Sequence, residues 1–327
     1  MLLTRRGFTQ LGLGSLCAAA MPRVARAAYS LEIMAPYYKS LITMAPIAVG
    51  LENGIYAKHG INVKDVVTSV GGGTGIRNMI GGGLPYAEMG TASVLAGFKA
   101  GLNVRIVHNS ITTVRDILWV TMPNSPINSI KDLAGKKIGI SAPRSTSETF
   151  AIFALEAAGM AGQAKLVATG PVGSGLSALE NGGVDAAFIL EPLYSQRKDR
   201  YKVAFTLDDL PPASQNVGIA TTDFIKSRPE ELKAIIAARR EAVDFIYANI
   251  DEAARITSKR YGDTLPPDVA PIAMRRMAGI NYWSRGNIDT VGLNTIVKVL
   301  ERQGEWQGPA DWEQIVDRSF LPNDLKA

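Results

Sequence analysis

Short apolar segments alternate with helical segments through the first two-thirds of this chain, and that alternation limits the folds open to it. In the first series the expected strands are residues 31–34, 61–67, 86–89 and 104–108, and the expected helices are 44–53, 76–80 and 94–100. In the second series the expected strands are 117–121, 137–140, 166–168, 186–190 and 203–205, and the expected helices are 147–158, 176–181 and 193–198. This alternation predicts an α/β fold with largely parallel sheets.

The last third of the chain differs, because after one more expected strand at 217–221 it is nearly all helical. Apolar side chains recur at three- and four-residue spacing, which predicts an amphipathic helix, at Leu232, Ile235, Ile236, Val243, Ile246 and Tyr247. Two α/β series and a helical tail predict two lobes, with the tail packed on the first. We expect lobe 1 to comprise residues 28–115 and 216–327, and lobe 2 residues 116–215.

Residues 1–27 have the three parts of an export signal. The sequence TRRGFT is followed by an apolar run at 11–21 and by a small-x-small site that ends at Ala27. Paired Arg5 and Arg6 followed by Phe8 resemble a twin-arginine signal, and the alternative is a general secretion signal with a chance arginine pair. The apolar run is shorter than the roughly 20 residues that a membrane-spanning helix needs. We therefore expect cleavage after Ala27 and export to the periplasm.

Charge and cysteine content exclude several classes of function. The formal net charge is +5, from 35 basic and 30 acidic side chains, but 4 of the arginines lie in the leader. The remaining chain has 31 basic and 30 acidic residues, so a basic surface for nucleic acid is not expected. The single cysteine, Cys17, also lies in the leader, which excludes disulfides and cysteine chemistry from the body. With only two histidines besides, we expect no metal, no cofactor and no enzyme activity.

Four segments, in order, resemble a known family. They are APIAVGLENGIYAKHGINV at 45–63, and the segments at 81–107, 124–148 and 178–195. They resemble the periplasmic binding proteins for sulfonates, nitrate, taurine and thiamine-pyrimidine precursors. The resemblance implies a type II periplasmic binding fold, in which the chain crosses between the lobes twice and the ligand binds in the cleft.

The resemblance also implies partners: a small-molecule ligand and the permease and ATPase of an ABC importer, with the receptor expected to be a monomer. The pyrimidine synthases of the same superfamily use a cysteine-rich motif and an active-site histidine, and the body of this chain has no cysteine. A small organic anion or zwitterion, such as a sulfonate or carboxylate, is the expected ligand. The alternatives are a pyrimidine-like or aromatic solute, an exported enzyme on the same fold, and the sensing half of a regulator.

Candidate ligand contacts are sought where a strand ends and a helix begins, because helix N-termini present free N–H groups and partial positive charge. Thr91 and Ser93 occupy one such junction, and Ser145, Thr146 and Ser147 occupy a second. Either group could instead serve only to cap its helix, which contributes about 1 kcal/mol. Three consecutive hydroxyl groups exceed what one cap needs, so we expect ligand contact at the second junction.

By the resemblance, the loop after the first strand lies at the mouth of the cleft, where Tyr37 or Tyr38 could stack on the ligand. Glu191 matches a cleft-facing acid or amide of the family, which would favour a ligand with N–H donors. It could equally be an acid at a helix N-terminus. Asn216, just before the strand at 217–221, is a further candidate of the same kind.

Two arginines complete the set of candidates. Arg115 lies near the expected first crossover and could clamp an acidic ligand or hold a neighbouring acid such as Asp116. Arg144 is expected to be a solvated charge of the loop. The glycine run at 71–73 resembles a phosphate-binding loop, but no lysine followed by Ser or Thr comes after it, so we expect a flexible edge beside the cleft.

Overall fold

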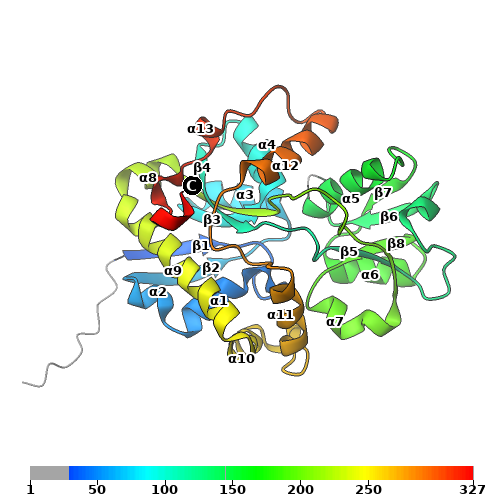
Figure 1. The fold of residues 1–327 in the computed structure, drawn as a ribbon, viewed down its shortest axis with the longest axis horizontal. Helices are drawn as coiled ribbons and strands as arrows, with labels where there is room; N and C mark the ends of the chain where they lie inside the picture. The colour runs from blue at the N-terminus through cyan, green and yellow to red at the C-terminus, as the bar shows by residue number, and fades with distance from the viewer. Residues whose placement is uncertain (1–28, 144, 327) are drawn as a thin grey trace, which may run out of the picture.

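In the computed structural model, which describes residues 29–143 and 145–326, the strands form two five-stranded sheets in two lobes (Figure 1). The first sheet has the order β2-β1-β3-β10-β4. Its strands are β1 (Tyr29–Met34), β2 (Ile61–Val67), β3 (Tyr86–Gly90), β4 (Val104–Ile111) and β10 (Asn216–Thr221). The expected export signal and Arg144 lie outside the described residues.

The second sheet repeats the arrangement, in the order β7-β6-β8-β5-β9. Its strands are β5 (Leu118–Thr121), β6 (Lys137–Ile140), β7 (Lys165–Ala168), β8 (Ala186–Ile189) and β9 (Lys202–Phe205). In each sheet two neighbouring pairs are parallel and two are antiparallel. The antiparallel pairs are made by the one strand that enters from the other lobe: β10 between β3 and β4, and β5 between β8 and β9. The chain thus crosses between the sheets after β4 and again before β10, and the expected α/β fold is confirmed.

Helices cover both sheets. Those of the first lobe before the crossover are α1 (Ala45–Glu52), α2 (Ile55–Lys58), α3 (Gly72–Gly81) and α4 (Thr91–Lys99). Those of the second lobe are α5 (Thr146–Ala157), α6 (Val172–Glu180) and α7 (Leu193–Arg197). The tail comprises α8 (Thr222–Ser227), α9 (Pro229–Ala248), α10 (Ile250–Tyr261), α11 (Ala270–Gly279), α12 (Thr290–Arg302) and α13 (Trp312–Ile315).

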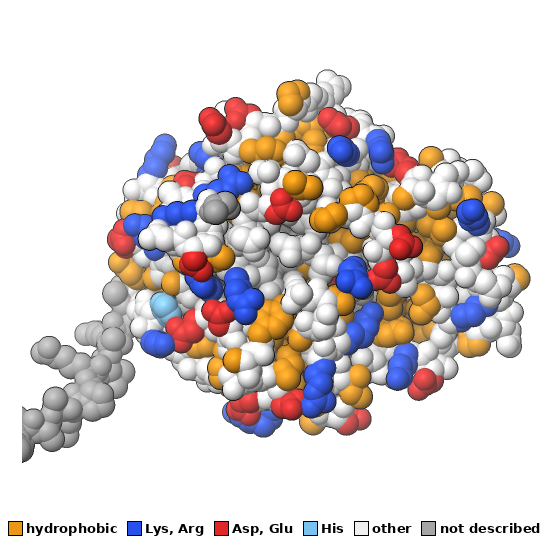
Figure 2. All heavy atoms as spheres, in the orientation of Figure 1, with side chains coloured by type: hydrophobic (Ala, Val, Ile, Leu, Met, Phe, Trp, Pro, Cys, Tyr) orange, Lys and Arg blue, Asp and Glu red, His pale blue; other side chains and the backbone are white. Residues whose placement is uncertain are grey.

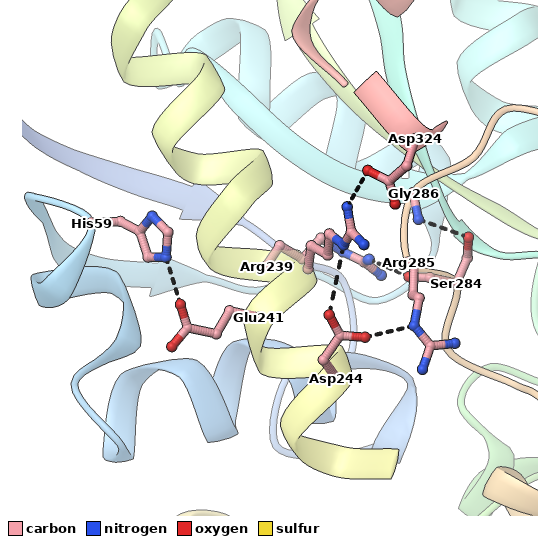
Figure 3. Close-up of polar contacts among 9 residues, drawn as sticks. His59, Arg239, Glu241, Asp244, Ser284, Arg285, Gly286 and Asp324 are labelled. Atoms are coloured by element: carbon pink, nitrogen blue, oxygen red, sulfur yellow. Dashed lines mark hydrogen bonds and ion pairs between the residues drawn. The ribbon is translucent and has the colours of Figure 1, made fainter. Parts of the chain in front are cut away.

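The tail packs on the first lobe, as the sequence predicts. The long helix α9 lies against α1 and α2, and its buried residues include the expected apolar positions Leu232, Ile235, Ile236, Val243 and Ile246. Polar contacts hold its outer face: Glu241 is hydrogen-bonded to His59 at 2.8 Å, and Asp244 forms an ion pair with Arg285 at 2.5 Å (Figure 3). Helix α12 packs on α4 and also contacts α5 of the second lobe, so the tail reaches further than expected.

Helix α3 is longer than the sequence indicates, because it begins at Gly72 inside the glycine run that was expected to be a flexible edge. Gly71 precedes it with a φ of 81°, which disfavours any other residue. A Cβ on Gly72 would lie 2.2 Å from the Ser93 Oγ atom, so only glycine allows α3 to begin this close to α4. The glycines therefore position a helix N-terminus.

The surface agrees with the balanced charge of the body. Figure 2 shows Lys and Arg side chains interspersed with Asp and Glu over one face, rather than a patch of one sign. Within the described ranges, no helix combines the length and the apolar character that crossing a bilayer requires.

Candidate functional site

A cavity of about 80 Å³ lies between the two lobes. One water needs roughly 10–15 Å³, so the cavity has room for a small molecule. Both lobes and both crossovers line it, through Pro36, Tyr37, Leu41, Thr43, Met44, Gly71, Gly72, Glu88, Met89, Gly90, Ile117, Ser141, Ser145, Thr146, Ser147, Val172, Phe188, Leu190, Gln215 and Asn216. Among the described residues, the lining includes no Lys or Arg.

The cavity lies at the carboxyl ends of parallel strands from both sheets. Tyr37 lies just beyond β1, Gly71 beyond β2, and Gly90 ends β3. From the second sheet, Ser141 follows β6 and Leu190 follows β8. Ligands of open α/β sheets bind at these strand ends, so the fold makes this cavity the candidate site.

Three helices begin at the cavity wall: α3 at Gly72, α5 at Thr146 and α6 at Val172. No side-chain cap bonds the first turns of α3 and α6. The N–H groups and the positive ends of the helix dipoles therefore converge on one small space, which favours an anionic or strongly hydrogen-bonding group there.

The loop before α5 is held by its own hydroxyl groups. Ser145, not Ser147, is the N-cap, and its Oγ atom accepts a hydrogen bond from the Glu148 backbone at 3.2 Å. The Ser147 Oγ atom accepts from the Ser141 backbone at 2.8 Å and lies 3.0 Å from the Oγ atoms of Ser141 and Ser145. Ser145 and Ser147 therefore fix the conformation of this loop, and both line the cavity together with Thr146.

The lobes approach each other closely at Gly90 and Thr146. A Cβ on Gly90 would lie 2.8 Å from the Thr146 Oγ1 atom and 4.0 Å from the Asn216 Oδ1 atom. Asn216, the first residue of β10, pairs with Gly90 in the sheet and lines the same wall. The structure thus brings Thr146 and Asn216, two of the predicted residues, to one end of the cavity.

Tyr37 connects the lobes across the cleft. Its backbone has a φ of 60°, which is unusual for a residue other than glycine. Burial raises the pKa of its hydroxyl, which is hydrogen-bonded to Ser141 of the second lobe. Residues held in such conformations cluster at ligand clamps, and the position fits a side chain that covers the ligand.

Two predicted contacts, Thr91 and Ser93, lie behind the cleft lining rather than in it. Thr91 is fully buried, and its backbone N–H donates to the Gln215 carbonyl at 3.0 Å. Ser93 is 6% exposed beneath Gly72. Helix α3 begins earlier in the chain than expected, at Gly72. Its N-terminus, rather than the hydroxyl groups of Thr91 and Ser93, therefore lines the cavity.

Tyr38 and Arg115 also lie outside the lining. The Tyr38 hydroxyl accepts a hydrogen bond from Arg260 of the tail at 2.9 Å. Arg115 is 53% exposed, and its Nε atom bonds Asp208 at 3.0 Å, which joins the two crossovers. Both side chains hold elements together, and neither is among the residues that line the cavity.

Glu191 is not among the residues that line the cavity. Its carboxylate accepts from the Ser195 backbone at 3.1 Å, from the Ser195 hydroxyl at 2.9 Å and from Arg276 at 2.9 Å. The residue is 2% exposed. The bond to Arg276, which lies in the tail, makes it a contact between lobes rather than part of the cleft.

Sequence reasoning missed Glu88, which lies at the floor of the cavity. Its carboxylate accepts from the Arg239 Nε atom at 2.9 Å, and both side chains are 2% exposed. Burial is the largest single effect and would raise the pKa of Glu88, but the Arg239 guanidinium, His108 and a hydrogen bond from Ser110 together outweigh it, and the pKa is lowered. An acid inside the apolar strand YAEMG was the signal that could have identified it.

Polar side chains also join the crossovers to the tail beneath the cavity. The Asp116 carboxylate, 1% exposed, accepts from the Gln215 amide at 2.7 Å and from the Tyr282 hydroxyl at 2.8 Å. The Tyr282 oxygen lies 3.0 Å from the Thr43 Oγ1 atom. Gln215 and Thr43 both line the cavity, so this network connects the cavity wall to both crossovers and to the tail.

Two α/β lobes, two crossovers and a cleft at the strand ends define the class: this is the type II periplasmic binding fold. The alkanesulfonate-binding protein SsuA from Xanthomonas axonopodis pv. citri, solved bound to MOPS, superposes with a TM-score of 0.75. It is 14% identical, and the match covers 89% of this chain and 98% of that one.

Residues 42–253 match the NMT1/THI5-like family, and the chain belongs to it. A binding protein of Brucella abortus (strain 2308) is 28% identical over 284 residues, covering 78% of this chain and 82% of that protein. A Bacillus subtilis (strain 168) protein assigned to aliphatic sulfonates is 26% identical over 297 residues, covering 87% of this chain and 86% of that protein.

Proposed function

We propose that this chain is a non-catalytic periplasmic receptor that delivers a small organic anion or zwitterion, of the sulfonate or carboxylate type, to the permease and ATPase of an ABC importer. The observation that carries the proposal is the convergence of the α3, α5 and α6 N-termini on one small cavity between two lobes. Closure of such lobes around a ligand is a common transport mechanism.

The chemistry of the wall supports an anion with a short apolar part. Helix N-termini and hydroxyl groups supply neutral donors for oxygen atoms, as in many anion sites. Met44, Met89, Ile117 and Phe188 supply an apolar surface beside them. The names of the sulfonate-binding relatives agree with this class.

The pyrimidine-like alternative loses its main support. It rested on Glu191 as a cleft carboxylate that would accept from ligand N–H groups, and Glu191 is paired with Arg276 outside the cavity. The carboxylate that does line the cavity, Glu88, is already neutralised by Arg239.

Binding of ethanesulfonate to the mature protein tests the proposal. At one hundred times its dissociation constant the ligand should raise the free energy of unfolding by about 2.7 kcal/mol, since it binds only the folded form. Thr146→Ala should weaken the affinity roughly 3- to 100-fold, because a hydrogen bond to a charged group contributes about 1.5–3 kcal/mol and a neutral one about 0.5–1.5.

Calorimetry and thermal melts measure both quantities, with Ser177→Ala as the control. Ser177 is an exposed hydroxyl residue on α6, outside the cavity, and its loss should leave the affinity unchanged. Failure of ethanesulfonate and of short carboxylates to bind would refute the proposed ligand class. An unchanged affinity in Thr146→Ala would show that the ligand lies elsewhere in the cleft.

Export by the twin-arginine route is the second expected result. The protein recovered from the periplasm should begin at Ala28 by N-terminal sequencing. Replacing Arg5 and Arg6 with lysine should block export, because that pathway reads the arginine pair. Unchanged export of this variant would show instead that the general secretion route suffices.

A further inference from the structure

The segment around α11 belongs to the first lobe but reaches the second. Helix α11 packs on α10, which packs on α1. Just after it, the Trp283 indole N–H donates to the Ile42 carbonyl at 3.1 Å, and Tyr282 bonds Thr43. These contacts anchor α11 to lobe 1, so any contact it makes with lobe 2 connects the two lobes.

Arg276 of α11 makes such a contact. Its Nη1 atom lies 2.9 Å from the Glu191 Oε1 atom, and its guanidinium lies over the Tyr194 ring at 4.6 Å. The Glu191 side chain is 1% exposed and that of Arg276 is 28% exposed. The ion pair is therefore shielded from water on the acid side, where the attraction is least screened.

The Arg276–Glu191 ion pair can break without leaving its carboxylate unpaired. Glu191 keeps two hydrogen bonds from Ser195, in its own lobe, whether or not Arg276 is present. If the lobes separate, the carboxylate retains these bonds and the guanidinium gains water. The Glu88–Arg239 pair differs, because both members lie in lobe 1 and opening would not part them.

A second contact lies beside the first. The Gln196 amide donates to the Thr264 carbonyl at 2.9 Å, which joins α7 of lobe 2 to the turn before α11. On the α12 side of the tail, Arg302 pairs with Glu156 of α5. None of these side chains lines the cavity, so they hold the lobes together without touching a ligand.

We propose that Arg276 is a positioning residue: through Glu191 it latches lobe 2 to the tail and holds the binding-competent, closed arrangement. The affinity of a receptor scales with the fraction of molecules in that arrangement, so the latch strengthens binding from outside the cleft. This inference rests on the proposed receptor function only for its effect on affinity; the effect on the lobes can be measured without a ligand.

The mature chain has no cysteine, so two can be introduced for spin labels. Lys131 in lobe 2 and Lys226 in lobe 1 are both exposed, and distances between labels at these positions report lobe separation. In ligand-free protein, Arg276→Ala should shift the closed-to-open ratio roughly tenfold toward open, which corresponds to about 1.4 kcal/mol. Arg276→Lys, which keeps the charge, should restore part of the closed population.

Arg275→Ala is the matched control, because Arg275 pairs with Asp251 inside the tail and is 57% exposed. It should leave both the label distances and the melting temperature unchanged. If Arg276→Ala gives the same distance distribution as the parent protein, the latch does not exist. Absence of ethanesulfonate binding would instead refute the proposed ligand class and leave the distance result intact.

Discussion

Replacing Arg239 with alanine is expected to destabilise the folded protein by about 3–5 kcal/mol, the range measured when one partner of a buried ion pair is removed. Glu88 would then be a buried carboxylate without its cation. The Ser284 and Ser110 carbonyls would also lose the N–H donors of Arg239, which bond them at 2.6 and 3.1 Å. Urea denaturation at neutral pH measures the loss.

The next residue of α9 gives the control. Arg240 bonds Asp324 at 2.7 Å on the outside of the helix, where the acid is 59% exposed. Figure 3 shows Asp324 on the C-terminal segment beside α9, and Arg239 extending from α9 toward Ser284. Arg240→Ala should cost less than about 1 kcal/mol, as exposed pairs do. Equal effects of the two substitutions would contradict the account of the buried pair.

Removing the charge of Asp116 is expected to make the stability of the protein less dependent on pH. Burial raises the pKa of Asp116 to about 6, against hydrogen bonds from Tyr282 and Gln215 and the charge of Arg276, which lower it. The folded state therefore binds a proton more tightly than the unfolded state, where the ordinary value is 3.8. The stability due to this proton is fully present below pH 3.8 and is lost as the pH rises through 6.

The difference between a pKa of about 6 and the ordinary 3.8 corresponds to about 3 kcal/mol. An asparagine side chain at this position would stay uncharged and could still accept from Gln215. We therefore expect Asp116→Asn to gain most of this, about 2.4 kcal/mol, relative to the parent protein as the pH rises from about 4 to about 7. Denaturation of both proteins across that range measures the difference, which isolates Asp116 from other titrating groups. A difference independent of pH would mean that Asp116 titrates normally in the fold.

The order of strands and helices was predictable because apolar periodicity is a local property of the chain. Strand β6 and the stripe of α9 match the expected positions closely. The ends of elements were less predictable, because neighbours determine them. Strand β4 runs on to Ile111 because it pairs there with Asn216, a partner more than one hundred residues away.

The candidate site was predictable where it depends on a strand end followed by a helix. Tyr37, Thr146 and Asn216 were identified on that basis or by family position, and all three line the cavity. Ser141 also follows a strand directly and could have been found by the same rule. Whether each residue contacts a ligand stays a prediction that the Thr146 variant begins to test.

The sequence by itself determined the class of fold, the near-neutral body and the absence of cysteine chemistry, because composition and periodicity need no knowledge of distant contacts. Only the tertiary structure decided where individual charges point. Glu191 and Arg276 are 85 residues apart, and Glu88 and Arg239 are 151 apart. A charge exerts its effect through the partner that folding brings within hydrogen-bond distance, and spacing along the chain does not reveal that partner.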